Sequence, residues 1–540
     1  MPVADHSTGG EWVVRALRAE GVRHVFGIPG VHNLAIYDAL LGQPDITHVL
    51  ARHEQGAAFM ADGYARASGR PGVVVVTSGP GATNTLTPLV ESWAGSQPVL
   101  VLMSDIPLAL IGRDLGALHE VPNQIDCFRP VARWAETIKD GGAIAETVQR
   151  AFQLFRSQRP GPVALSVPFD LLTARTEGRI AAPTGSRPGC DRALIARAAD
   201  LLRRARRPAI IAGGGVIAAE AGGALGALAR RLGAPVITTV MGRGAVPDSD
   251  PCWLGVLPNK LVSGPALAMA DVVLAVGCRF AHRSTQGLLL NLSFTAEQTL
   301  IHLDLDPSVP GKIFTPSLAI VGDARDGLGA LVEALGEGRA ETGWEPSWLA
   351  GLRAARSPRY SAEADRLIRL LRAGLARDAI VVSDQTGINY WMEWHFPVLA
   401  PRTFLYPVGS ATLGYGVPAA IGAKVAHPGR QVIAVVGDGG FLFSVNELAT
   451  AVKYGLGVVF LVLNDDRYGA IKYLQEAMFG RWGEADLSNP DFPALARAFG
   501  AAGERVARLD DLPRALDTAL SRPGPTVLEL PLGIEPPWEL

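Results

Sequence analysis

Asp438 and Asp465 are the residues of this chain whose type and spacing most directly suggest chemistry. Asp438 follows the apolar, β-branched run 431–436, and Asp465 follows a second apolar run at 457–463. The residues between them, 444–454, carry apolar side chains at helical spacing, so the pattern predicts a strand, a crossover helix and a second strand. Such a unit is right-handed and parallel, and neighbouring strands lie about 5 Å apart. Both carboxylates are then expected at the carboxyl edge of the sheet, within reach of one cation.

The glycines around Asp438 add a phosphate-binding element to this predicted cation site. Gly437, Gly439 and Gly440 allow the backbone to approach a phosphate, and the helix start that follows them supplies free N–H groups. Oxygen ligands suit a hard ion such as Mg²⁺, which usually keeps phosphate oxygens as partners. The sequence therefore predicts a joint metal and diphosphate site. The alternative is an ordinary glycine-rich turn with surface aspartates.

The run VVGDGGF at 435–441, followed by NDDRYG at 464–469, resembles the diphosphate signature of thiamine-diphosphate enzymes. In that family a GDG run is followed by an N-N or N-D pair. The resemblance implies that Asp438, Asp465 and the backbone carbonyl of Arg467 hold Mg²⁺. It also assigns Tyr468 and, early in the chain, Pro29 to the binding of thiamine diphosphate.

A second motif, RHEQGAA at 52–58, resembles the glutamate motif of the same family. The segments ADGYAR at 61–66 and TSGPGATN at 77–84 extend the likeness. By this resemblance Glu54 hydrogen-bonds the aminopyrimidine ring of the coenzyme and promotes the loss of the thiazolium proton. The alternative for Glu54 is a solvated carboxylate at a helix end, which is the usual place of a glutamate.

A third motif, GSATLGYG at 409–416, resembles the turn that bends the coenzyme into a V shape. Leu413 is then the apolar wedge between the two rings, and the carbonyl of Ala411 accepts a hydrogen bond from the 4′-amino group. A buried leucine in a glycine turn is the alternative.

The length and patterning of the chain predict the domains that carry these motifs. A chain of 540 residues is too long for one core and suggests about three domains. Apolar runs that alternate with helical patterns predict an α/β fold of three doubly wound parallel-sheet domains. They are expected at 1–173, 192–335 and 358–540, separated by polar linkers. The resemblance implies that the first is the pyrimidine-binding domain, the second a central domain and the third the diphosphate-binding domain. The first and third share the order strand, glycine turn, helix and strand, which hints at duplicated architecture.

Composition also excludes several classes of function. The net charge of −2 gives no reason to expect a nucleic acid or a charged membrane surface as partner. No apolar run approaches the length of a membrane span, and no N-terminal signal pattern is present. The four cysteines are scattered without metal-ligand spacing and indicate reduced thiols. We therefore expect a cytoplasmic enzyme.

The resemblance covers nearly the whole chain and points to the group that contains acetolactate synthases, benzoylformate decarboxylase and benzaldehyde lyase. It implies a reaction in which the coenzyme ylide adds to the carbonyl of a 2-oxoacid, a C–C bond breaks and the resulting enamine is protonated or ligated. The predicted function is a thiamine-diphosphate- and Mg²⁺-dependent 2-oxoacid decarboxylase or carboligase. An acetolactate synthase-like carboligase and a hydroxyketone lyase are the alternatives. Family members hold one coenzyme between two subunits, so a homodimer or homotetramer is expected. A non-catalytic homologue is disfavoured because Glu54, Asp438 and Asp465 are all present.

Two histidines, His32 and His119, distinguish the chain from true acetolactate synthases and resemble positions in benzaldehyde lyase and in 2-ketoarginine decarboxylase. Both are predicted to face the thiazolium, where an imidazole moves protons near neutral pH. The sequence does not assign acid and base between them, and the alternatives are a helix cap for His32 and loop packing for His119. The substrate, a 2-oxoacid or an aldehyde, is expected to meet a mostly apolar wall of Val31, His32, Leu118, His119, Phe169, Leu474 and Met478.

The middle block predicts no flavin. After the MGRG loop at 241–244 it lacks the His-Gly turn of the flavin-binding synthases, so the central domain is expected to be structural.

Overall fold

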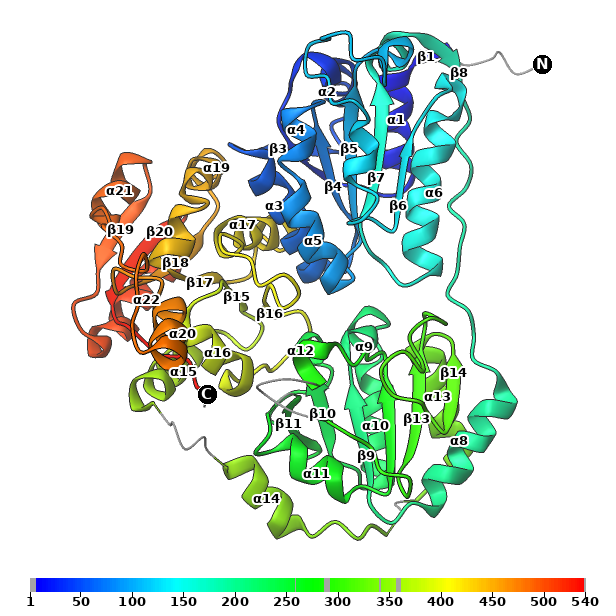
Figure 1. Ribbon diagram of the computed structural model, residues 1–540, viewed down its shortest axis with the longest axis vertical. Helices are drawn as coiled ribbons and strands as arrows, with labels where there is room; N and C mark the ends of the chain where they lie inside the picture. Colours follow the sequence, from blue (N-terminus) through cyan, green and yellow to red (C-terminus); the bar gives the residue numbers. More distant parts are fainter. Residues whose placement is uncertain (1–5, 258, 286–291, 339–340, 356–360, 539–540) are drawn as a thin grey trace.

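Three α/β domains follow one another along the chain (Figure 1). The computed structural model describes residues 6–257, 259–285, 292–338, 341–355 and 361–538. Each domain is built on a six-stranded sheet whose paired strands are all parallel, so the predicted fold class is confirmed. The predicted domain limits at residues 1, 358 and 540 lie outside the described residues.

The N-terminal sheet is covered by helices on both faces. One face carries α1 (Gly9–Ala19), α2 (Leu34–Leu41) and α6 (Ile144–Ser157), and the other carries α3 (Glu54–Ser68) and α5 (Leu86–Gly95). Its strand order is β3 (Thr47–Leu50), β2 (His24–Gly27), β4 (Gly72–Val76), β5 (Val99–Asp105), β7 (Val163–Pro168) and β6 (Trp134–Thr137). A small antiparallel pair, β1 (His6–Thr8) and β8 (Arg175–Glu177), ties the start of this domain to its end.

The C-terminal sheet repeats this topology. One face carries α15 (Ala362–Gly374), α16 (Gly387–His395) and α22 (Leu512–Leu520), and the other carries α17 (Gly416–Ala426), α19 (Leu448–Lys453) and α21 (Phe492–Ala498). Its strand order is β16 (Phe404–Leu405), β15 (Ile380–Ser383), β17 (Val432–Gly437), β18 (Val458–Asn464), β20 (Thr526–Pro531) and β19 (Ala502–Arg505). Numbered within each domain, both sheets have the order 2-1-3-4-6-5, which confirms the hint of duplicated architecture.

Strand β17 illustrates why these runs form central strands. Val432, Ala434 and Val436 point into the core shared with the N-terminal domain, whereas Ile433 and Val435 pack under α15 and α16. Successive side chains of a strand face opposite sides, so a continuous β-branched run suits a strand that is buried on both.

The N-terminal and C-terminal domains share one hydrophobic core, in which α3 and α17 pack face to face (Figure 1). Two glycines permit this close approach. A Cβ on Gly63 would lie 2.2 Å from the carbonyl oxygen of Ala419, and one on Gly422 would lie 1.9 Å from that of Met60. The contact fixes the orientation of α3, and therefore of Glu54 at its start.

The central domain, green in Figure 1, lies beside both others. Its strand order is β11 (Trp253–Leu257), β10 (Val236–Thr239), β9 (Pro208–Ala212), β12 (Val272–Val276), β13 (Thr299–Asp304) and β14 (Leu318–Val321). Its helices include α8 (Arg192–Arg204), α9 (Gly214–Ala218), α10 (Gly222–Leu232), α11 (Ser263–Met269) and α13 (Ala324–Leu335). The order reverses between β9 and β12, the position at which open α/β sheets bind ligands. A cavity of about 760 Å³ opens there, lined by residues of all three domains.

In the described part of the chain, no helix has the length and apolar character needed to cross a membrane. All four cysteines are free thiols.

Candidate active site

The turn that follows β4 gathers the predicted catalytic residues of the N-terminal domain. A Cβ on Gly81 would lie 3.5 Å from Glu54 Oε1, and one on Gly79 would lie 2.6 Å from the carbonyl oxygen of His119. Ser78 Oγ lies 2.6 Å from His32 Nδ1. The residues Glu54, His32 and His119 therefore surround one glycine turn at the carboxyl edge of this sheet.

Glu54 is the first residue of α3 and is half-buried. His53 caps the helix, because its imidazole accepts the N–H of Gln55. The Glu54 carboxylate accepts one hydrogen bond, at 2.9 Å, from the side-chain amide of Asn84. Its other oxygen, Oε1, lies toward Gly81 and is available to a ligand at the turn.

His32 and His119 lie against each other, with ring centroids 5.7 Å apart, and the ring of Phe169 lies 5.5 Å from that of His32. Burial lowers the pKa of His32, and the neighbouring His119 lowers it further. His119 has a left-handed backbone (φ 62°), and its buried Nδ1 has no hydrogen-bond partner in the structure. The pair thus combines an imidazole that stays neutral at pH 7 with an unsatisfied ring nitrogen.

The turn that carries Ala411 and Leu413 is held by its neighbours. Ala411 has a left-handed backbone (φ 53°), which is strained for a residue with a side chain. The buried carboxylate of Asp384 accepts the N–H of Gly416 at 3.0 Å, and Ser444 donates to the carbonyl of Gly414 at 2.6 Å. Burial raises the pKa of Asp384 to about 6.

Asp438 and Asp465 leave the ends of adjacent parallel strands, as predicted. Gly437, the last residue of β17, pairs with Leu463 of β18, so the two aspartates follow neighbouring strands. Burial raises the pKa of both carboxyl groups, and Asp465 raises that of Asp438 further. Two carboxylates at neighbouring strand ends, one buried and one half-buried, are stabilised by a shared cation.

The segment after Asp438 differs from the prediction in one detail. A short helix, α18 (Asp438–Leu442), begins at Asp438 itself, and the predicted crossover helix is divided into η6 (Val445–Glu447) and α19. The side chain of Asp438 accepts the N–H of Gly439 at 2.8 Å, so the glycine turn closes into a helical turn directly after the strand.

Tyr468 and Arg467 complete the surroundings of this pair. A Cβ on Gly439 would lie 2.5 Å from the Tyr468 ring, so only glycine allows the ring to lie on this turn. The Arg467 guanidinium donates to Asp465 Oδ2 at 2.8 Å.

Asn489 also lies at this site, although the sequence did not predict it there. Its side-chain amide lies 2.7 Å from Asp438 Oδ2, 3.1 Å from Asn464 Oδ1 and 3.0 Å from Asp466 Oδ1. It therefore links the loops that follow β17 and β18. The segment NPDF at 489–492 also resembles the acetolactate synthase group of thiamine-diphosphate enzymes, and this resemblance was the signal that could have identified it.

The donor set at this edge fits a hard cation bound with a diphosphate. Within the described ranges no group of three His, Cys, Asp or Glu side chains forms a metal site. The predicted ligands, two carboxylates and the backbone carbonyl of Arg467, would leave several coordination positions open, which suits Mg²⁺, an ion that completes its octahedron with phosphate oxygens and water.

The residues predicted to line the substrate pocket lie in two different domains of the chain. Val31 and Leu118 stand beside the histidines, whereas Leu474 and Met478 lie on α20 (Gly469–Phe479), which buries none of its residues. Leu118 is 59% exposed and Met478 is 65% exposed, so these apolar walls are open within a single chain.

Glu54 and Ala411 of one chain lie near opposite ends of α3. Arg66, 12 residues after Glu54 on this helix, donates to Glu91 at 2.9 Å, and Glu91 in turn accepts the N–H of Ser410 at 2.7 Å. Twelve helical residues span about 18 Å. One aminopyrimidine ring is too small to reach both groups across that distance.

Comparisons with known proteins agree with this geometry. Models described as thiamine pyrophosphate enzyme N-terminal TPP binding domain, central domain and C-terminal TPP binding domain match residues 7–127, 195–331 and 384–530. A probable 2-ketoarginine decarboxylase of Pseudomonas aeruginosa is 40% identical, covering 97% of this chain and 94% of its own. The acetolactate synthase isozyme 2 large subunit of Escherichia coli is 34% identical (98% and 97%), and the acetolactate synthase large subunit of Haemophilus influenzae is 34% identical (95% and 92%).

Proposed function

Because the chain belongs to the thiamine pyrophosphate enzyme family, we propose that it is a Mg²⁺- and thiamine-diphosphate-dependent decarboxylase of 2-oxoacids. Thiamine diphosphate and thiamine pyrophosphate are the same coenzyme. The observation that carries the proposal is the pairing of Glu54 and two histidines on one sheet edge with Asp438 and Asp465 on the equivalent edge of a second, like-ordered sheet.

The coenzyme, when bound, supplies a nucleophilic carbon that adds to a carbonyl and accepts the electrons of the broken C–C bond. The chain's part is to bind and orient it. Glu54 donates a hydrogen bond to the pyrimidine ring nitrogen, Ala411 accepts one from the 4′-amino group, and Leu413 separates the two rings. Pro29 lies in the loop between β2 and the histidine segment, on the pyrimidine side.

The diphosphate belongs at the start of α18. Gly437, Asp438, Gly439 and Gly440 form the turn that would hold it, and the ring of Tyr468 lies against this turn. Mg²⁺ is held by Asp438, Asp465 and the backbone carbonyl of Arg467. Asn489 orients Asp438 by the hydrogen bond already described.

His32 and His119 move protons at the reacting carbon. The pKa of His32 lies below its ordinary value, so its neutral form is available at pH 7 and is lost as the pH falls through that lowered pKa. We expect kcat/KM to decline as the pH falls through the lowered pKa of His32, and His32→Gln to lower kcat by about 100-fold.

His119→Asn is a second variant that tests this titration. Removing the neighbouring charge raises the pKa of His32, so the acid limb moves to higher pH. An NMR titration of the His32 ring follows the same shift without relying on activity. An unchanged His32 pKa in His119→Asn would contradict the claim that His119 lowers the pKa of His32.

The predicted wall residues favour a 2-oxoacid with an uncharged aliphatic or aromatic side chain. The name of the Pseudomonas relative favours 2-ketoarginine (5-guanidino-2-oxopentanoate) as substrate instead. A panel that contains pyruvate, branched 2-oxoacids, benzoylformate and the guanidino compound, assayed for CO₂ release with and without Mg²⁺ and coenzyme, tests the proposal. Failure of the protein to bind thiamine diphosphate by calorimetry would refute it.

A carboligase is the second candidate, favoured by the acetolactate synthase relatives that cover almost the whole chain. The two reactions share all steps until C–C cleavage and differ in whether a proton or a second carbonyl is accepted. Product analysis with one 2-oxoacid, alone and with an added aldehyde, separates an aldehyde product from a hydroxyketone. The same assay run with hydroxyketones tests the lyase alternative.

The active unit is proposed to be a homodimer, or a homotetramer built from such dimers. The length of α3 between Glu54 and the Ala411 turn supports a coenzyme held between two chains. Exposed apolar side chains at both half-sites, among them Leu118 and Met478, support their burial against a second copy.

We propose that the reaction needs no flavin. Arg243 of the MGRG loop is buried and donates to the carbonyls of Met392 and Glu393, so this loop serves the contact with the C-terminal domain. A flavin, if the protein held one, would belong in the cavity at the β9 and β12 reversal. Because the loop lacks the His-Gly turn of the flavin-binding synthases, the purified protein is expected to show no visible flavin absorption, and a bound flavin would overturn this point.

A further inference from the structure

Two buried glutamates outside the proposed catalytic set, Glu91 and Glu447, occupy equivalent places in the two like-ordered domains. Glu91 lies on α5, in the helical segment after β4, and Glu447 ends η6, in the helical segment after β17. Both side chains are fully buried. Each crosses the contact between the domains and binds the backbone of a coenzyme-binding turn in the other domain.

Glu447 holds the turn that leads into Glu54. Its Oε1 accepts the N–H of His53 at 3.0 Å, and its two oxygens accept the N–H of Arg52 at 3.2 and 3.1 Å. Thr450 donates to Oε2 at 2.7 Å. A Cβ on Gly56 would lie 2.2 Å from Oε1, so glycine at this position of α3 is what lets the carboxylate approach.

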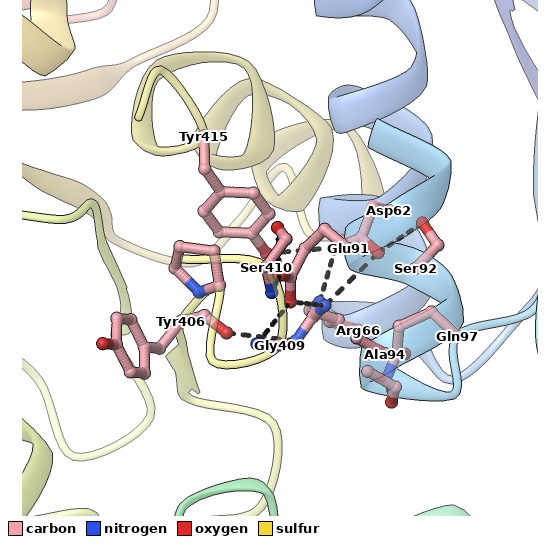
Figure 2. Close-up of polar contacts among 12 residues, drawn as sticks. Asp62, Arg66, Glu91, Ser92, Ala94, Gln97, Tyr406, Gly409, Ser410 and Tyr415 are labelled. Carbon is pink, nitrogen blue, oxygen red and sulfur yellow. Dashed lines mark hydrogen bonds and ion pairs between the residues drawn. The ribbon is translucent and has the colours of Figure 1, made fainter. Parts of the chain in front are cut away.

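Glu91 holds the turn that carries Ala411 (Figure 2). Its Oε2 accepts the N–H of Ser410 at 2.7 Å and the Ser410 hydroxyl at 2.8 Å. Its Oε1 accepts Arg66 Nη2 at 2.9 Å, and Arg66 is also paired with Asp62 on α3. The residue after Ser410 is the strained Ala411, whose carbonyl direction depends on how this turn is held.

The polar contacts recorded for each glutamate are made by N–H and O–H donors, which makes both sites specific for a carboxylate. A buried carboxylate costs free energy unless such donors satisfy it. Burial raises the pKa of Glu447 to about 7, and the donors from Thr450, Arg52 and His53 oppose that rise. A neutral glutamine offers one acceptor oxygen instead of two and no negative charge, so at least one donor at each site faces an N–H₂ group and the remaining hydrogen bonds to the backbone are weaker.

We propose that Glu447 and Glu91 are positioning residues of the coenzyme site, Glu447 for the Glu54 carboxylate and Glu91 for the Ala411 carbonyl. The inference rests on the proposed function. Neither glutamate touches the coenzyme. Each acts through the turn that it holds, and both groups that they position act on the aminopyrimidine ring.

The test compares Glu447→Gln and Glu91→Gln with Glu393→Gln as a matched control. Glu393 is equally buried and pairs with Arg283 at 3.0 and 2.9 Å, so its carboxylate is held by a side chain rather than by the backbone of either turn. The first measurement is amide hydrogen exchange in the coenzyme-free protein. We expect exchange at Arg52 and His53 to be about tenfold faster in Glu447→Gln, and exchange at Ser410 to be about tenfold faster in Glu91→Gln.

The second measurement is the exchange rate of the C2 proton of bound thiamine diphosphate, followed by NMR after acid quench. We expect both variants to slow it by about 10- to 100-fold at saturating coenzyme, because a small misplacement of the acting groups has effects of this size. Glu393→Gln is expected to leave it within about twofold, even if its melting temperature falls.

Wild-type exchange rates at C2 in both variants, with only a lower melting temperature, would overturn the proposal and leave the glutamates a structural role. If the glutamine variants do not fold, Thr450→Val and Ser410→Ala remove one donor from each carboxylate and are judged by the same two rates. A wild-type protein that does not bind the coenzyme would refute the proposed function itself, which separates the two failures.

Discussion

Glu54→Gln is expected to abolish turnover while leaving the fold and the metal site intact. The substitution keeps the size of the side chain and its contact with Asn84, but it removes the proton that the carboxyl group shares with the pyrimidine ring nitrogen. General acid–base groups contribute about 10² to 10⁴-fold, and this one acts before any substrate can react, so we expect a loss at the upper end of that range.

Steady-state kinetics with the best substrate of the panel, together with calorimetry of coenzyme binding, measures this effect. Coenzyme affinity is expected to change much less than kcat, because the diphosphate half-site is untouched. Gln55→Glu combined with Glu54→Gln serves as a control, since it restores the charge one residue away without restoring the position. A wild-type rate in Glu54→Gln would refute the role assigned to Glu54.

Asp438→Ala is expected to remove Mg²⁺-dependent binding of the coenzyme. Residues that merely orient a metal ligand contribute about 10- to 100-fold to metal affinity, so loss of a ligand itself should weaken coenzyme binding by at least about 100-fold. Asp438 also accepts hydrogen bonds from Gly439 and Asn489, and these donors lose their partner.

Calorimetry with thiamine diphosphate in the presence of Mg²⁺ and after chelation measures the loss. In the wild type, chelation should have the same effect as the substitution. Asp491→Asn is the matched control, because this exposed residue caps α21 and asparagine caps helices equally well. Coenzyme binding that is insensitive to both chelation and Asp438→Ala would contradict the metal assignment.

The parts of the structure that were predicted from sequence rest on local signals. The runs before Asp438 and Asp465 are apolar, β-branched and bounded by glycine or acidic residues, and this is enough to identify two buried parallel strands. The proposed site residues come from motifs of fewer than ten residues, so Glu54, Leu413 and Asp438 could be proposed before the fold was known.

The parts that were not predicted depend on contacts between distant segments. Glu447 binds the N–H of Arg52 across 395 residues of sequence, and no local pattern distinguishes it from a surface glutamate on an amphipathic helix. The bridging role of Asn489 depends in the same way on the packing of three loops. The left-handed conformations of His119 and Ala411 arise because tertiary contacts outweigh the backbone preference of these residues.

The central claim is that one coenzyme is held by Glu54 of one chain and Asp438 of another, and a complementation experiment tests it most directly. Glu54→Gln and Asp438→Ala chains, each inactive alone, are co-expressed at equal levels. Half of the resulting dimers then contain one chain of each kind, and one of their two sites combines an intact Glu54 with an intact Asp438. The account predicts recovery of about a quarter of wild-type activity. A mixture that stays as inactive as its two parents would contradict it.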